Sequence, residues 1–266
     1  MPDYAAAREY WHSDEPKTPE ELDILLGSFR VLFAYHSGKI ENDQITYHDT
    51  REIFENGKAL NFTGDPRALF EQQNQKLCYD FLRRKIVEKE PLSVVLIKEV
   101  HAILTGGTFD ERRYVDKGER PGEFKKHDYV TGIHEVGYAP EEVEPAISEL
   151  IDELTELNPN ADILKAAAYF HARFEYIHPF VDGNGRVGRT LLNYFLMTHG
   201  EPPVIVYDED KKEYYQALER YDMDEEIDAL TEFLRKQTAK TWTKALERST
   251  GTAKQLKKKL EDFWAE

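Results

Sequence analysis

Residues 178–189 read His178-Pro179-Phe180-Val181-Asp182-Gly183-Asn184-Gly185-Arg186-Val187-Gly188-Arg189. A proline disfavours the α conformation at the residue before it, so a helix is predicted to end at His178, at an exposed corner. Gly183 and Gly185 flank Asn184 and allow a positive φ, which turns successive backbone N–H groups toward one point. The residues that follow have the pattern of a helix start. The segment therefore predicts a helix, a tight loop and a second helix.

The same segment carries the charges of an anion site. Arg186 and Arg189 stand at a predicted helix N-terminus, and both features attract anions. Asp182 lies beside them, and a carboxylate next to a polyphosphate is typical of a Mg2+ ligand, because this ion keeps phosphate oxygens and water in its shell. We infer a nucleoside triphosphate site with His178 aimed at it. The alternative is a glycine-rich loop between helices in which the histidine is incidental.

The segment matches the Fic family signature, HPF-x-D-GNGR-x-x-R, at every defining position. Fic proteins are adenylyltransferases that move AMP from ATP onto a hydroxyl side chain of a protein. The resemblance implies that His178 takes the proton from a Ser, Thr or Tyr hydroxyl and that Asp182 binds Mg2+. The groups implied to bind the phosphates are the donors of Gly183, Asn184 and Gly185, with Arg186 and Arg189 on the β- and γ-phosphates.

A second motif, Ser37-Gly38-Lys39-Ile40-Glu41-Asn42, resembles the inhibitory pattern [S/T]-x-x-x-E-[G/N] of many Fic proteins. Its position resembles that of the class with an N-terminal inhibitory helix in the same chain, which we place at about residues 36–48. Glu41 paired with Arg189 would occupy the guanidinium that otherwise holds the γ-phosphate. Ser37 and Asn42 complete the inhibitory set. On the residues alone, a helix cap at Ser37 and a solvated Glu41 remain an alternative.

Residues 108–140 lack helical periodicity, and the β-prone run at 129–133 predicts a short hairpin. Pro121–Lys125 is similar to the lead-in of the Fic flap, which implies a flap at about residues 122–136 that lies over the active site. Such a flap pairs with a target segment as an added strand. We assign further nucleotide contacts to Tyr129, Val130, Thr131 and Gly132. The chain departs from the family pattern at Lys125, where arginine is common, and at Ala139, where a double proline is frequent.

Glu213–Leu218 resembles the segment that lines the adenine pocket in Fic proteins, and Tyr215 is the expected base contact. Where relatives often have asparagine seven residues on, this chain has Asp222. Tyr214 and Tyr215 as plain packing residues remain an equal alternative.

Three other residues are assigned structural roles. Cys78, the only cysteine, falls in a helical pattern and is expected to be buried rather than reactive. His171 lies two turns before the signature and is expected to be a hydrogen-bonded core residue. His101 is expected to be a packing or solvent-edge residue.

The composition excludes several classes of function. The chain has 35 basic and 51 acidic residues and a formal charge of −16, so it lacks the cationic surface that non-specific nucleic-acid binding needs. No apolar run approaches the ~18 residues of a membrane span, and the N-terminus has no signal-peptide pattern. We expect a soluble, cytoplasmic protein without a nucleic-acid or membrane partner.

Apolar residues recur at helical spacing through most of the chain, which predicts a mostly α protein. The resemblance implies a Fic-fold helical bundle with a small β-hairpin flap and flanking helices. We expect an N-terminal helical region at residues 1–91, a Fic core at 92–222 and C-terminal helices at 223–266. Residues 1–19 are expected to be a polar arm or a loose first turn, and Pro19–Tyr35 to be one helix.

The predicted function is transfer of AMP from ATP to a hydroxyl of a protein target, or of the chain itself, under inhibition by Glu41. One alternative is another reaction at the same site, either removal of AMP or transfer of a different nucleotide. A second is a non-catalytic nucleotide sensor. A homo-oligomer is also compatible with the sequence.

Overall fold

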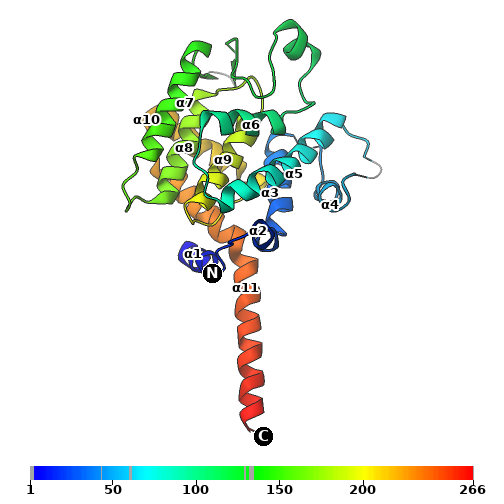
Figure 1. Ribbon diagram of the computed structural model, residues 1–266, viewed down its shortest axis with the longest axis vertical. Coiled ribbons are helices and arrows are strands. Elements are labelled where there is room, and N and C mark those ends of the chain that lie inside the picture. The colour runs from blue at the N-terminus through cyan, green and yellow to red at the C-terminus, as the bar shows by residue number, and fades with distance from the viewer. Residues whose placement is uncertain (1–2, 43, 60–61, 129, 132–134, 266) are drawn as a thin grey trace.

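The computed structural model describes residues 3–42, 44–59, 62–128, 130–131 and 135–265. These residues are mostly helical (Figure 1), which confirms the predicted fold class. The long helices are α1 (Tyr4–Ser13), α2 (Pro19–Leu25), α3 (Phe29–Glu41), α4 (Tyr47–Asn56), α5 (Pro66–Val87), α6 (Val94–Leu104), α7 (Pro140–Thr155), α8 (Ile163–Ile177), α9 (Asn184–Thr198), α10 (Lys211–Asp224) and α11 (Asp228–Ala265). Two short helical turns, η1 (Arg112–Asp116) and η2 (Asp208–Asp210), and two strands, β1 (Val130–Thr131) and β2 (Glu135–Val136), complete the described elements.

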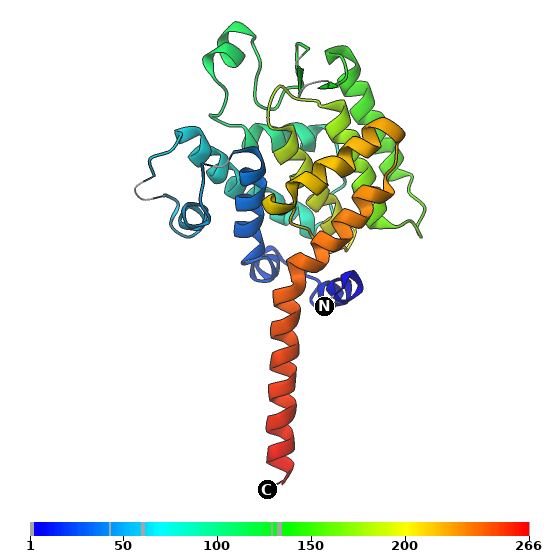
Figure 2. The same ribbon diagram turned by 180° about the vertical axis from the view of Figure 1, so that it is seen from behind.

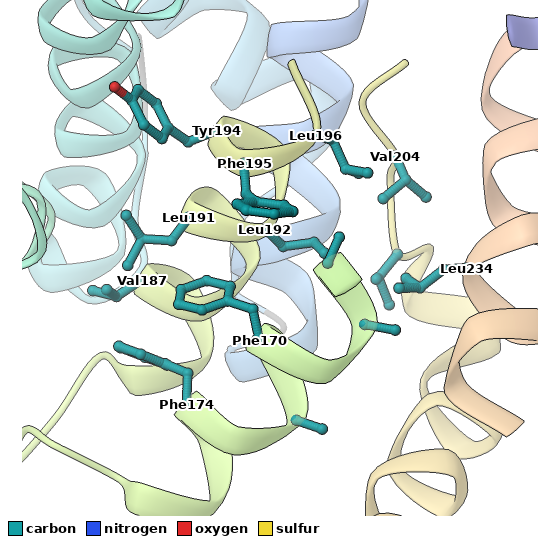
Figure 3. Packing of buried hydrophobic residues seen from close by; sticks show 14 of the residues in the cluster. Phe170, Phe174, Val187, Leu191, Leu192, Tyr194, Phe195, Leu196, Val204 and Leu234 are labelled. Atoms are coloured by element: carbon teal, nitrogen blue, oxygen red, sulfur yellow. The ribbon is translucent and has the colours of Figure 1, made fainter. Parts of the chain in front are cut away.

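Helix α9 lies at the centre of the fold. It contacts α3, α5, α6 and α8, and every residue from Arg186 to Thr198 is buried. Figure 3 shows aromatic side chains of α8, including Phe170, gathered with Leu191 and Phe195 of α9. The rings of Phe170 and Phe195 lie 6.3 Å apart. Because close packing fixes α9 on several sides, the start of this helix is a rigid platform for the loop before it.

The helix predicted over residues 19–35 is wrong as a single element. Helix α2 ends at Leu25, and α3 begins at Phe29. Gly27 falls in the turn between them, where its low helix propensity favours an interruption. Leu26 on one side of the turn is fully buried, so the break reorients the chain without exposing its apolar side.

The predicted bounds of the inhibitory helix, residues 36–48, are also wrong. Residues 36–41 are the last part of α3, and Asn42 has an extended backbone. A new helix, α4, starts after Thr46, whose side chain accepts a hydrogen bond from the backbone of Asp49 while Asp49 returns the contact. This capping box begins a separate helix and explains why the earlier one does not continue.

The predicted polar arm at residues 1–19 is wrong, because its first part is α1. Asp3 caps this helix by accepting a hydrogen bond from Ala6 N at 2.9 Å. Ala7 and Trp11 are buried, and the ring of Trp11 packs at 5.6 Å from that of Trp242 on α11. The partner of α1 is more than 200 residues away, so the local pattern gives no sign of it.

Helix α11 continues beyond this contact as one long helix whose C-terminal part projects away from the body in both views (Figures 1 and 2). Cys78 is buried, as predicted. Among the described residues, no helix is both long and apolar enough to cross a bilayer.

The region without helical periodicity contains one short antiparallel strand pair, in which Val130 pairs with Val136 and Thr131 with Glu135. The pair lies within the residues predicted for the hairpin. The predicted nucleotide contacts cannot be placed, because Tyr129 and Gly132 lie outside the described residues, as do the side chains of Val130 and Thr131.

Candidate functional site

His178 is the residue at which α8 ends. Its N–H donates to Phe174 O at 3.1 Å, and its backbone is left-handed, with φ 51°. A positive φ in a residue other than glycine costs free energy and persists only where the surroundings fix it. The predicted helix end is therefore present, but the predicted exposed corner is wrong: His178 is only partly accessible.

Two backbone hydrogen bonds explain that partial burial. Lys125 N donates to Pro179 O at 2.9 Å, and Tyr138 N donates to Ile177 O at 3.1 Å. The segments before and after the strand pair are thus attached to the chain on either side of His178. Sequence analysis missed both bonds, since main-chain contacts leave little trace in side-chain identity.

The loop between α8 and α9 is stapled by the side chain of Asn184. Its Oδ1 accepts from Phe180 N at 2.9 Å, and its Nδ2 donates to Phe180 O at 2.7 Å. The amide therefore binds the loop itself through both its oxygen and its nitrogen, and its contact with a phosphate remains a prediction. Gly183, with φ 81°, is the N-cap of α9, and a Cβ there would come within 2.7 Å of Thr105 Cγ2. The backbone N–H groups at this helix start can meet an anion.

Arg189 lies on the first turns of α9 and meets the end of α3. Its Nη2 donates to Glu41 Oε1 at 2.7 Å and to Ser37 O at 3.0 Å, and its Nε donates to Ser37 Oγ at 3.0 Å. The guanidinium is buried, whereas the Glu41 side chain is 37% exposed. The contact predicted between Glu41 and Arg189 is present. Gly185 makes room for it, since a Cβ there would collide with the Glu41 carboxylate.

Asp182 is surrounded by three arginines. Arg67 Nη2 on α5 donates to its Oδ2 at 2.6 Å, Arg113 Nη1 lies 3.6 Å from the same oxygen, and Arg186 Nη2 lies 3.7 Å from Oδ1. Burial alone would raise the pKa of Asp182, but these guanidinium groups outweigh it and hold the pKa below its ordinary value. Sequence analysis missed Arg67 and Arg113, which lie in segments far from the signature and follow no motif.

Arg186 itself is buried and lies 3.2 Å from Glu71 Oε1 on α5. The resemblance implied that Arg186 and Arg189 hold the β- and γ-phosphates. The structure gives the two arginines different surroundings, with Arg186 held between two carboxylates, those of Glu71 and Asp182.

His101 makes more specific contacts than its sequence pattern predicts. It is fully buried, and its ring stacks on that of Phe180 at 3.7 Å. Its Nδ1 accepts from Gly122 N at 2.8 Å, so the proton belongs on Nε2, which lies 3.1 Å from Asp182 O. One imidazole therefore links the segment before the strand pair, at Gly122, with the loop between α8 and α9, at Asp182. The expected packing role is present, but the side chain does not lie at the solvent edge.

His171 is a hydrogen-bonded core residue, as predicted. It is fully buried, and its Nε2 lies 2.6 Å from Tyr214 Oη. Tyr214 is buried with it, whereas the neighbouring Tyr215 is 46% exposed. The packing alternative therefore fits Tyr214, and the adenine contact of Tyr215 remains a prediction.

Two fully buried histidines, His101 and His171, and the partly accessible His178 are expected to give the fold a pH dependence. Burial lowers the pKa to about 4 for His101, about 3 for His171 and about 4 for His178, against an ordinary value of 6.5. Nearby positive charges lower each pKa further: Arg186 acts on His101, Arg189 on His171 and Lys125 on His178. Below about pH 6.5 the unfolded chain binds protons at these histidines and the native chain does not. The free energy of unfolding therefore falls as the pH drops from that value toward 4.

We expect the free energy of unfolding to be lower at pH 5.0 than at pH 7.0 by about 2 kcal/mol for each of these histidines, measured by urea denaturation. A His101→Gln variant should show a smaller pH dependence than the wild type. Equal stability at the two pH values would contradict the prediction.

Comparison with known proteins finds relatives of this chain. Residues 91–196 match the model of the Fic/DOC family. The chain is 31% identical to protein adenylyltransferase Fic of Drosophila willistoni over 188 residues, and 31% identical to protein adenylyltransferase fic-1 of Caenorhabditis elegans over 194 residues. The alignments cover 69% and 70% of this chain but only 35% of each relative, so the chain spans about a third of their length.

Solved structures share the fold over nearly the whole chain. A Fic domain-containing signalling protein from Bacteroides thetaiotaomicron superposes with a TM-score of 0.77 at 24% identity, covering 93% of this chain and 97% of that one. Residues 134–508 of Caenorhabditis elegans Fic-1 superpose with a TM-score of 0.74 at 24% identity, covering 95% and 71%.

Proposed function

We propose that this chain, which carries a domain of the Fic/DOC family at residues 91–196, is a protein adenylyltransferase that moves AMP from ATP to a hydroxyl side chain. The proposal rests on the groups at the two ends of the loop between α8 and α9. A histidine that stays neutral at working pH lies at its start, and the anion-binding N-terminus of α9 with buried Arg189 lies at its end. A base and a phosphate site in that order suit attack on a nucleotide by a protein hydroxyl.

In the proposed reaction His178 accepts the proton of the target Ser, Thr or Tyr hydroxyl as its oxygen bonds to the α-phosphorus. The bond from that phosphorus to the β-phosphate oxygen breaks, and pyrophosphate leaves. Backbone N–H groups of the turn at Gly183 and Gly185 stabilise the charge that develops, and Arg189 holds the γ-phosphate once Glu41 releases it. Arg186 is assigned to the β-phosphate. The main contribution of the protein is to position the phosphates.

Asp182 fits the role of the Mg2+ ligand. Mg2+ is usually bound through one or two carboxylates together with substrate phosphates, and Asp182 offers one partly accessible carboxylate beside the phosphate loop. If Asp182 bound Mg2+, its three arginine partners would need another anion, and the phosphates would supply it. When bound, Mg2+ neutralises charge on the phosphates.

Asp182→Asn is expected to weaken binding of Mn2+, as a paramagnetic substitute for Mg2+, by at least about tenfold in the presence of ADP, because a carboxylate ligand is replaced by a neutral amide. Electron paramagnetic resonance measures the free ion directly and needs no catalysis. Glu71→Gln serves as the matched control, since Glu71 is a nearby buried carboxylate not assigned to the metal. Equal Mn2+ affinity in wild type and Asp182→Asn would remove Asp182 from the metal site.

The protein target is proposed to be held next to the short strand pair by main-chain pairing, which accepts many sequences. The target can be a separate protein or another copy of this chain. Light scattering during the labelling assay tests whether the chain self-associates.

The deciding experiment supplies ATP, CTP, GTP and UTP, each labelled on the α-phosphate, to wild type and Glu41→Gly protein with a cell lysate. Label transfer from ATP alone is the expected result. Failure of both proteins to label themselves or any lysate protein with AMP would falsify the proposal. Release of AMP from a previously labelled protein would instead favour the reverse reaction, with Glu41 orienting water. Tight ATP binding without turnover in Glu41→Gly would favour a nucleotide sensor.

A further inference from the structure

Lys125 is a buried cation whose ammonium group makes no hydrogen bond to the described residues. Its side chain is 97% buried, at 3% relative exposure, and its Nζ has no hydrogen-bond partner among the residues that the structure describes. A buried ammonium that makes no hydrogen bond carries a large desolvation cost. Burial accordingly lowers its pKa. Such a group is rarely kept unless a ligand completes its contacts.

The ammonium lies beside His178. A Cβ placed on Gly137 would come within 3.1 Å of Lys125 Nζ, 2.5 Å of His178 Cβ and 2.8 Å of Ile177 O. These three groups therefore fill the small space next to the Cα of Gly137, which is open to them only because this residue has no side chain. The backbone of Lys125 is held there by its 2.9 Å hydrogen bond to Pro179 O. The lysine is part of the wall of the active site rather than of the outer surface.

The charges around this space do not neutralise Lys125. Asp128 is the carboxylate that acts on it, but Asp128 is exposed, where water screens its charge. His178, which burial and Lys125 together keep neutral, also faces Glu41 from α3 and Asp182 from the anion loop. The three charged groups that act on the base are thus one cation next to it and two carboxylates that already pair with arginines.

We propose that Lys125 is a catalytic residue that binds a non-bridging oxygen of the phosphate transferred next to His178. This inference rests on the proposed function and extends it, because it names a phosphate ligand outside the signature. An ammonium donates strong hydrogen bonds to phosphate. The bound phosphate also offsets the positive charge next to the imidazole, so His178 becomes a better base only when substrate is in place.

The test measures equilibrium binding of AMP and of adenosine, which lacks the phosphate, by isothermal titration calorimetry. Lys125→Met, which keeps the unbranched shape and most of the length of the side chain and removes its charge, is expected to lose at least about tenfold in AMP affinity and to leave adenosine affinity unchanged. Lys125→Arg should stay within about threefold of wild type for AMP. Lys126→Met, a neighbouring exposed lysine, is the control and should bind AMP like wild type.

Thermal unfolding separates a ligand role from a structural one. Because Lys125→Met removes an unpaired buried charge, it should unfold at the same or a higher temperature than wild type. Equal AMP affinity in wild type and Lys125→Met would overturn the inference, and so would a large loss of stability. AMP binding requires no transfer, so this result stands even where labelling fails. Normal AMP transfer by Lys125→Met would reject the role of Lys125 and leave the proposed function intact.

Discussion

Glu41→Gly is expected to raise the rate of AMP transfer about a hundredfold. In the wild type the Glu41 carboxylate lies 2.7 Å from Arg189 Nη2, which is the group proposed to hold the γ-phosphate. ATP must therefore displace a charge-assisted contact to a buried guanidinium, and a hydrogen bond to a charged group contributes up to about 3 kcal/mol. That free energy corresponds to about two orders of magnitude in rate.

The geometry explains why release should give an active site rather than a collapsed one. Ser37 binds Arg189 through both its carbonyl and its hydroxyl, and these bonds do not involve Glu41. The end of α3 is also anchored by His36, whose Nδ1 lies 2.6 Å from Asp208 Oδ1 on η2. The arginine therefore keeps its position after the carboxylate is removed.

The measurement is the initial rate of AMP incorporation into the chain or a labelled lysate protein. Glu41→Gln removes the charge but keeps a hydrogen-bonding side chain, so its rate should fall between those of wild type and Glu41→Gly. Glu55→Gly, at an exposed glutamate on α4, controls for introducing a glycine near a helix end and should match wild type. An unchanged rate in Glu41→Gly would remove the inhibitory role and leave the chemistry untouched.

The sequence predicted the parts of the site that one short segment or two matched motifs contain. The turn around Gly183 and the helix end at His178 follow from residue types whose backbone requirements are specific, whereas the contact between Glu41 and Arg189 was implied by the resemblance of two motifs to those of Fic proteins. The roles of individual atoms were less predictable. The Asn184 amide binds the loop, because backbone groups in a tight turn must find partners before any ligand arrives.

Contacts between distant segments account for what the sequence could not predict. His101 sits on α6 in an apolar pattern, and only the packed structure brings Gly122 and the carbonyl of Asp182 to its two nitrogens. Lys125 appeared in the sequence only as a replacement for arginine. Its burial beside His178 depends on where the non-helical segment is attached, and that attachment uses backbone atoms.

His178→Ala is expected to reduce AMP transfer by at least about a thousandfold, which is within the range that a positioned general base contributes. The comparison is best made in the Glu41→Gly background, where the rate is high enough to measure a loss of that size. Because burial, reinforced by Lys125, lowers the pKa of His178 to about 4, the imidazole is unprotonated throughout the neutral range. The rate of the Glu41→Gly protein should therefore vary little from pH 6 to pH 8 through this group.

Binding should separate the base from the phosphate site. His178 makes its proposed contribution to the attacking hydroxyl, so Glu41→Gly/His178→Ala is expected to bind ATP within about threefold of Glu41→Gly alone, whereas loss of Arg189 should weaken ATP binding. His12→Ala, at an exposed histidine remote from the signature, controls for the loss of an imidazole. Transfer that persists in the double variant would show that another group accepts the proton. Within the described site no second histidine is placed to do so: the two that lie close by are committed to partners, His101 to the loop and His171 to Tyr214.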